Sequence, residues 1–252
     1  MPYGLVLSGG GVRGAYHVGV WNAICEMGIE ISAIAGTSIG AINGAMFISD
    51  KNAAEKLWNK IAVEDIVKLS GNMAKDGNLF NIKNITKLVK EIEENGGLDT
   101  SPLEDLLHEV IDEDRVRNSP IDFGCSMYSI DERKEINISK NDMENGRLVD
   151  YLMASACLVG FKVREINSKR YIDGGISNNM PVDIIIDKGI RDIITVDVKG
   201  IGVKKDTDTT GCNIINIESK HKLTGTMDFD VDGIKQYIRE GDNDCINAFG
   251  RL

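Results

Sequence analysis

The chain alternates between short apolar runs and longer segments with a helical pattern. The runs 3–8 and 31–35 contain almost no polar residue, as is typical of parallel strands that are buried on both faces. The segments 14–28 and 39–49 that follow them are long enough for helices and rich in small or apolar residues. Two strands separated by a helix form a βαβ unit, which predicts a parallel sheet.

Residues 53–115 have a mainly helical pattern. The segment 101–104 (SPLE) predicts a helix start there, because Ser-x-x-Glu is a capping-box pattern and proline is favoured at the first helical position. This helical stretch is inserted between two parts of a sheet. We therefore expect it to form a helical cover over one end of that sheet.

Strand patterns return in the second half of the chain. Strands are predicted at 121–130, 135–139, 161–166, 170–173, 193–198 and 213–217, and helices at about 147–158, from Pro181 onward and at 231–249. No repeat, linker or low-complexity tract interrupts this order. The pattern predicts one domain over residues 1–252, a three-layer α/β/α arrangement with a mostly parallel central sheet and helices on both faces.

Composition narrows the function classes. The chain has 252 residues, with 42% hydrophobic and 27% charged residues, which is an ordinary globular balance. Its net charge of −10 argues against a nucleic-acid binder, which would carry a basic patch or stripe. The same charge argues against tight electrostatic docking on an anionic membrane, while transient apolar contact with a membrane surface stays open.

The cysteines and the chain start indicate a cytoplasmic protein. The five cysteines contain no Cys-x-x-Cys pair, so we interpret them as reduced thiols. Residues 1–8 lack the basic start of a signal peptide. The uncharged segment 31–49 is long enough to span a bilayer. Its glycines and polar residues favour a buried strand, a tight turn and a buried helix instead.

The most informative motif is G-x-S-x-G at 36–40, between a predicted strand and a predicted helix. In a nucleophile elbow, a serine stands on a strained turn above the sheet, and Gly36 and Gly40 would supply the small neighbours that this turn requires. The positive end of the following helix favours negative charge that develops at the serine oxygen. Ser38 is therefore a candidate nucleophile.

A second motif, GGGVRG at 9–14, follows the first predicted strand. Consecutive glycines can turn their N–H groups toward one point and form an anion-binding nest, here a possible oxyanion hole. The same glycines match the dinucleotide fingerprint G-x-G-x-x-G, which asks for an acidic residue at the end of the second strand. That strand ends in Gly36, Thr37 and Ser38 instead, so we treat a dinucleotide-binding module as the weaker alternative.

A catalytic serine requires a base. The chain has three histidines, His17, His108 and His221, and none follows a predicted strand or sits in a glycine-rich turn. Asp173, in contrast, lies at the end of a short predicted strand and is followed by Gly174 and Gly175. A carboxylate in a dry site can accept a serine proton if it lies within hydrogen-bond reach.

Taken in order, the G-G-G-x-R-G, G-x-S-x-G and D-G-G motifs resemble those of the patatin-like phospholipases, acyl hydrolases with a Ser–Asp dyad and no histidine. The resemblance covers nearly the whole chain and includes the segments 178–182 and 223–247. It implies that Ser38 is the nucleophile and Asp173 the base. It also implies an oxyanion loop supported by a basic residue; these positions are Gly9, Gly10, Gly11 and Arg13.

The segment 154–160 (ASACLVG) is similar to the family's A-S-A-x-x-P-G block, with Val159 where proline is usual. This departure affects the shape of the loop and removes no catalytic group. The resemblance predicts hydrolysis of fatty acyl esters of phospholipids or related lipids, through an acyl-enzyme and with no metal or other cofactor. A non-catalytic lipid-binding protein of the same fold is the main alternative. Lipid class and oligomeric state are not predicted.

Overall fold

The computed structural model describes residues 2–68, 94, 96–219 and 231–250. Its centre is an eight-stranded sheet. The strands are β1 (Tyr3–Leu7), β2 (Ile31–Thr37), β3 (Asp122–Ser129), β4 (Lys134–Ser139), β5 (Arg164–Ile166), β6 (Lys169–Asp173), β7 (Asp192–Asp197) and β8 (Asn213–Glu218).

The strand order is β5-β6-β3-β2-β1-β7-β8, and β4 pairs with β3 outside this path. The pairs from β3 through β2, β1 and β7 to β8 are all parallel. The pairs of β3 with β4, β3 with β6, and β5 with β6 are antiparallel. The sheet is therefore mostly parallel, as predicted, with an antiparallel end that carries Asp173.

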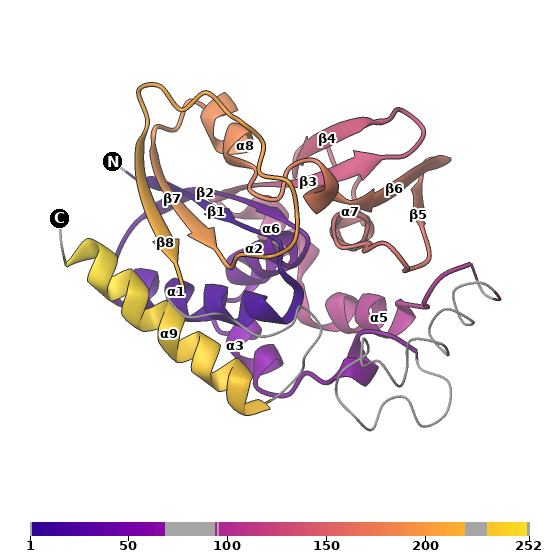
Figure 1. Cartoon of the computed structure of the whole chain (residues 1–252), viewed down its shortest axis with the longest axis horizontal. Helices are drawn as coiled ribbons and strands as arrows, with labels where there is room; N and C mark the ends of the chain where they lie inside the picture. Colours follow the sequence, from indigo (N-terminus) through magenta and orange to yellow (C-terminus); the bar gives the residue numbers. More distant parts are fainter. Residues whose placement is uncertain (1, 69–93, 95, 220–230, 251–252) are drawn as a thin grey trace.

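Helices cover both faces of the sheet (Figure 1). The longer ones are α1 (Ala15–Glu26), α2 (Ile39–Ser49), α5 (Ser101–Val110), α7 (Leu148–Ser155) and α9 (Val231–Phe249); the short ones are α3 (Ala53–Trp58), α6 (Glu113–Asn118) and α8 (Val182–Asp187). Single-turn 3₁₀ helices occur at η1 (Gly11–Gly14), η2 (Val63–Asp65) and η4 (Gly174–Ile176).

Side chains alternate between the two faces of a strand, and the two cores follow this rule. Leu5 and Leu7 of β1 belong to the large core beneath α1, α2 and α9, whereas Val6 joins the smaller core beneath α8. The predicted three-layer α/β/α arrangement is confirmed, with one thick helical layer and one thin layer.

The start of α5 corrects one prediction. The helix begins at Ser101, as predicted, but its N-cap is Thr100. The predicted capping box between Ser101 and Glu104 is wrong. Asp99 Oδ1 accepts the Ser101 N–H at 3.0 Å. The Glu104 carboxylate is 2.6 Å from Arg164 Nη1, so the glutamate of the predicted box bonds a distant arginine in place of the helix start.

The predicted cover at 53–115 consists, in the described residues, of α3, η2, α5 and the start of α6; residues 69–93 and 95 lie outside them. Two boundaries also differ from the prediction. The helix predicted to reach 158 ends at Ser155, and the strand predicted from 161 begins at Arg164. Phe161 instead makes isolated bridges with Leu98 and Val159, because the chain between α7 and β5 turns along the cavity described below.

The uncharged segment 31–49 forms β2, a turn and α2, as expected. Among the described residues, no helix is both long and apolar enough to cross a membrane.

Candidate active site

Ser38 occupies the turn between β2 and α2, with φ 57° and ψ −127°. A non-glycine residue held in this region stores backbone strain and is typical of functional turns. Its neighbours must be small: a Cβ on Gly36 would lie 2.3 Å from the Gly40 carbonyl carbon, and one on Gly40 would lie 2.2 Å from Leu7 O. The strand and helix therefore approach as closely as a nucleophile elbow requires.

Hydrogen bonds from distant elements hold this turn. The Ser38 N–H donates to Ser155 Oγ at 2.9 Å, and Ser155 Oγ donates to the Ser126 carbonyl at 2.7 Å. Thr37 Oγ1 donates to the Asn178 carbonyl at 2.8 Å. Ser155 lies in the segment 154–160, and its sequence alone predicts no role for it. The structure shows that Ser155 links the elbow to β3.

Strand register brings Asp173 to Ser38. Thr37, the last residue of β2, pairs with Ser126 of β3, and Asp173, the last residue of β6, pairs with the next residue, Met127. Because β4 occupies the other edge of β3 at these positions, β2 and β6 share one edge and meet end to end. The two strand ends therefore place the serine and the carboxylate side by side.

The carboxyl group of Asp173 is buried, with 8% of the residue exposed. Its Oδ1 accepts the Gly175 N–H at 2.7 Å, whereas its Oδ2 is buried without a hydrogen-bond partner among the described residues. Burial raises the pKa of Asp173 to about 6, and the nearby Ser38 hydroxyl and the Gly175 N–H partly offset this rise. A carboxylate with such a pKa is ionised at neutral pH and more basic than an exposed one.

The two glycines after Asp173 permit this approach. A Cβ on Gly174 would lie 2.3 Å from the Ser126 carbonyl oxygen, so no side chain fits where the segment crosses β3. A Cβ on Gly175 would lie 3.0 Å from Asp173 Oδ1, at the carboxylate that its own N–H binds. Gly174 and Gly175 therefore shape the loop that carries the candidate base.

The glycine loop after β1 lies against the elbow. A Cβ built on Gly9 would be 3.2 Å from Ser38 Cβ, and Gly11 lines the same cavity as Ser38. The Gly9 N–H donates to the Asn179 carbonyl at 3.2 Å. Among the described residues, the backbone hydrogen bonds outside regular elements give no acceptor to the N–H groups of Gly10 and Gly11, so these two amides are candidates for an oxyanion hole.

Arg13 connects the glycine loop to the segment that follows β7. Its guanidinium donates to the carbonyl of Lys199, in the segment after β7. The neighbouring Gly200 packs so closely that a Cβ there would lie 2.1 Å from Gly9 O. Arg13 thus joins η1 to a second segment that presses on the glycine loop.

The histidines lie elsewhere or outside the described residues. His17 is fully buried in α1, with Nδ1 3.2 Å from Asn43 Nδ2, and burial lowers its pKa to about 3. Its ring is therefore neutral at working pH and structural in its contacts. His108 lies in the last turn of α5, and His221 falls outside the described residues.

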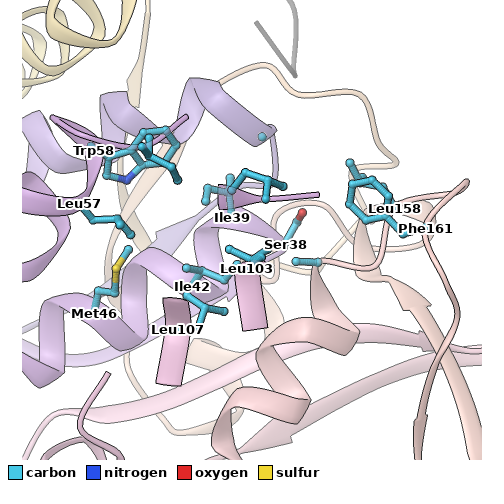
Figure 2. Close-up of a pocket in the computed structure, with 14 residues that line it drawn as sticks. Ser38, Ile39, Ile42, Met46, Leu57, Trp58, Leu103, Leu107, Leu158 and Phe161 are labelled. Carbon is cyan, nitrogen blue, oxygen red and sulfur yellow. The ribbon is translucent and has the colours of Figure 1, made fainter. Parts of the chain in front are cut away.

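An apolar cavity opens beside Ser38 (Figure 2). The empty space between its walls is about 590 Å³ when the open solvent at its mouth is included. Its walls come from the glycine loop, α2, α3, α5 and the segment after α7; the lining residues are Gly11, Ser38, Ile39, Ile42, Met46, Leu57, Trp58, Ile61, Ile66, Leu103, Leu107, Ala156, Leu158 and Phe161. Among the described residues of this lining, Ser38 contributes the one side-chain hydroxyl, so the cavity suits an apolar group with its reactive end at the serine.

A strained serine turn, a buried carboxylate beside it and an adjoining apolar cavity thus lie together at one end of the strands of an α/β sheet. Comparison with known families agrees. The family model described as patatin-like phospholipase matches residues 5–186. The chain belongs to the patatin-like phospholipase family, as predicted, and the enzyme class predicted with it, a lipid acyl hydrolase, is the class that this family name gives.

Curated relatives include the neuropathy target esterase sws of Drosophila melanogaster, 29% identical over 82% of this chain and 13% of that protein. Human patatin-like phospholipase domain-containing protein 6 is 27% identical over 81% of this chain and 14% of its own length. Lysophospholipase NTE1 of Mycosarcoma maydis is 27% identical over 80% of this chain and 10% of its own. The chain thus spans only about a tenth to a seventh of the length of these relatives.

Solved structures agree on the fold. VipD from Legionella pneumophila matches with a TM-score of 0.62 at 14% identity, over 99% of this chain and 67% of that one. ExoU from Pseudomonas aeruginosa, solved with SpcU, matches with a TM-score of 0.54 at 16% identity, over 99% of this chain and 52% of that one. These matches confirm the predicted patatin-like α/β fold.

Proposed function

We propose that this protein is a serine acyl hydrolase that cleaves fatty acyl esters of phospholipids or related lipids. The observation that carries the proposal is the meeting of Ser38 and Asp173 beside an apolar cavity that Ser38 lines. Ser38 is the nucleophile and Asp173 the general base, without a histidine.

In the first half of the reaction, Ser38 Oγ attacks the ester carbonyl carbon while its proton passes to the Asp173 carboxylate. The raised pKa of Asp173, about 6, supports this step, because a base works best when its pKa lies near the working pH. The protonated Asp173 then gives its proton to the leaving alcohol, and the acyl group stays on Ser38 as an ester.

The developing oxyanion needs donors. The amides of Gly10 and Gly11 supply them in this proposal, and donors of this kind are each worth roughly 3–4 kcal/mol to such a transition state. Gly9 holds the loop through the hydrogen bond of its N–H to the Asn179 carbonyl. Arg13 stabilises the loop through its hydrogen bond to the Lys199 carbonyl. In the second half, Asp173 takes a proton from water, which attacks the acyl-enzyme; Asp173 then returns this proton to Ser38 Oγ as the fatty acid leaves.

The substrate class follows from the cavity and the relatives. Its lining is apolar apart from Ser38, so an acyl chain fits the cavity while the polar part of the lipid stays at the mouth. Relatives named esterase and lysophospholipase support fatty acyl esters as substrates.

The proposal is tested by incubating the protein with phosphatidylcholine, lysophosphatidylcholine and p-nitrophenyl esters of short, medium and long acyl chains. We expect fatty acid release by the wild type, loss of release in Ser38→Ala, and covalent labelling of Ser38 by a fluorophosphonate. Labelling that persists in Ser38→Ala would refute the nucleophile assignment. Stable lipid binding with no hydrolysis by any substrate would favour the non-catalytic lipid-binding alternative.

A further inference from the structure

Large apolar side chains that face solvent gather around the candidate site. Five of the nine such side chains among the described residues lie on three segments next to Asp173. They are Val159 (82% exposed), Val163 (45%), Ile176 (48%), Ile201 (91%) and Val203 (52%). We call this set the apolar rim. Scattered apolar side chains are normal on a protein surface, whereas a concentration of them at one place marks an interaction site.

Hydrogen bonds attach each of these segments to the loop of Asp173. The carbonyl of Cys157, two residues before Val159, accepts the Asp173 N–H at 2.8 Å. The Val203 N–H donates to the Gly175 carbonyl at 2.8 Å, and the Val203 carbonyl accepts the Asn179 N–H at 2.7 Å. Ile176 ends η4, which directly follows Asp173. The apolar rim is therefore built on the same backbone that holds the candidate base.

The rim continues the apolar lining of the cavity to the outside. On the segment between α7 and β5, Leu158 and Phe161 line the cavity, while Val159 and Val163 are exposed. Figure 2 shows Leu158 and Phe161 close to Ser38. One short stretch of chain thus presents apolar groups both to the cavity and to the solvent beside it.

The positively charged side chains named next lie near the rim, within the described part of the chain, and each has an acidic partner. Four lysines and an arginine beside it each pair with a carboxylate: Lys162 with Asp99, Lys199 with Glu218, Lys204 with Asp197, Lys205 with Asp183 and Glu135, and Arg164 with Glu104. The whole chain carries a net charge of −10. This arrangement does not attract an anionic surface, and it suits an apolar surface without net charge.

We propose that the apolar rim is the surface by which this protein docks on an uncharged, zwitterionic lipid surface, with its side chains in the interfacial layer and the cavity mouth facing the lipid. The inference rests on the proposed function, since a lipid ester must pass from its layer to Ser38 without exposing its acyl chain to water. Because the binding energy comes from buried apolar area, docking depends little on salt or on anionic lipid.

The test uses the Ser38→Ala protein, so that the lipid stays intact, and measures flotation with phosphatidylcholine vesicles. We expect the parent to float with the vesicles and the added double change Val159→Asp, Ile201→Asp to lower the bound fraction at least about tenfold, because carboxylates resist the interfacial layer. Ile246→Asp is the matched control, since Ile246 is 45% exposed on α9 and outside the rim. It is expected to bind like the parent.

Two further measurements complete the test. Added phosphatidylserine is expected not to raise binding, and high salt not to lower it. When the same double change is made in the protein that keeps Ser38, we expect it to hydrolyse a soluble short ester within about twofold of the wild-type rate. Its hydrolysis of vesicle phospholipid is expected to be at least about tenfold slower. That split shows that the active site is folded and that the loss is one of docking.

Several results would overturn the inference. These are equal vesicle binding by the rim variant and the parent, an equal loss in the Ile246→Asp control, and binding that requires anionic lipid and vanishes in salt. A dimer that becomes monomeric in the rim variant would assign the surface to a second copy of the chain. A wild type that hydrolyses nothing yet binds through the rim would refute the proposed function alone, whereas hydrolysis without any role of the rim would refute the docking alone.

Discussion

At the Ser38 end of the cavity, backbone contacts and hydrogen bonds determine each position, whereas the far walls are held by apolar packing. Ser38, Ser155 and Ser126 form one bonded chain, and Gly40 leaves no room for even a methyl group. Met46 and Leu107, in the wall, are fully buried and contribute only apolar surface to the cavity. We therefore expect activity to depend on single atoms at the Ser38 end of the cavity. At the apolar wall, we expect it to depend on side-chain volume.

Among changes that leave Ser38 and Asp173 in place, the largest effect is expected from Gly40→Ala. The new Cβ would lie 2.2 Å from Leu7 O, a backbone atom, so β1 or the elbow has to shift. We expect esterase activity to fall at least about a hundredfold, since small displacements of reacting groups carry such losses, and stability to fall by about 3 kcal/mol. Esterase assays and urea denaturation measure both quantities.

Gly28→Ala is the control for that change. Gly28 has φ +67° but open space around the Cβ position. It is expected to cost about 1 kcal/mol of stability from backbone strain alone and to leave activity unchanged. Wild-type activity in Gly40→Ala would show that the close approach at the elbow is unnecessary.

A smaller effect is expected from Ser155→Ala. Removing Oγ leaves the Ser38 N–H and the Ser126 carbonyl without their partner, so the elbow loses its link to β3. We expect kcat to fall by about tenfold to a hundredfold with KM nearly constant, because the cavity is untouched. Ser177→Ala, which removes a longer bond of 3.3 Å to Gly174 O, should stay within about twofold. A loss confined to KM would contradict a positioning role.

Changes in the apolar wall of the cavity are expected to alter the preference for acyl chain length. Met46→Phe enlarges a buried residue that lines the cavity, and we expect kcat/KM for long acyl esters to fall about tenfold while short esters change less than about twofold. Met153 is also buried but lies outside the lining, so Met153→Phe should alter stability without changing the preference. An equal loss for all chain lengths in Met46→Phe would place the acyl chain elsewhere.

A further prediction concerns the stability of the fold and not its activity. Burial raises the pKa of Asp173 from 3.8 to about 6, so its ionised form destabilises the folded protein. The penalty is absent below about pH 4 and complete above about pH 6. We expect Asp173→Asn to be more stable than the wild type by roughly 2–3 kcal/mol at neutral pH, with the difference vanishing in acid. Urea denaturation at several pH values measures it, and a less stable variant at neutral pH would contradict the burial of a charge.

The same contrast explains what the sequence could predict. Gly36, Ser38 and Gly40 are visible in the sequence because a strained turn accepts few residue types, and the three-layer fold follows from the strand and helix pattern. The cavity walls are not visible, since any apolar residue of suitable size serves there. The meeting of Ser38 and Asp173 depends on the shared edge of β3, which no local pattern encodes.

The errors have similar causes. The capping box at 101–104 failed because Arg164, about sixty residues away in the chain, binds Glu104. Ser155 received no role from the sequence because its partners lie on β2 and β3. The ends of α7 and β5 were misplaced because apolar residues such as Leu158 and Phe161 face the cavity and imitate a buried helix or strand.

The central claim is that Asp173 serves as the base for Ser38 without a histidine. The most direct test is the pH dependence of kcat/KM for a soluble ester in the wild type and in Asp173→Asn. We predict one ionisation near pH 6 in the wild type, with activity rising tenfold per pH unit below it and constant above it. Asp173→Asn should lose at least about a thousandfold in rate while remaining folded. An Asp173→Asn protein that keeps activity within tenfold of the wild type, with the step near pH 6 preserved, would contradict the account.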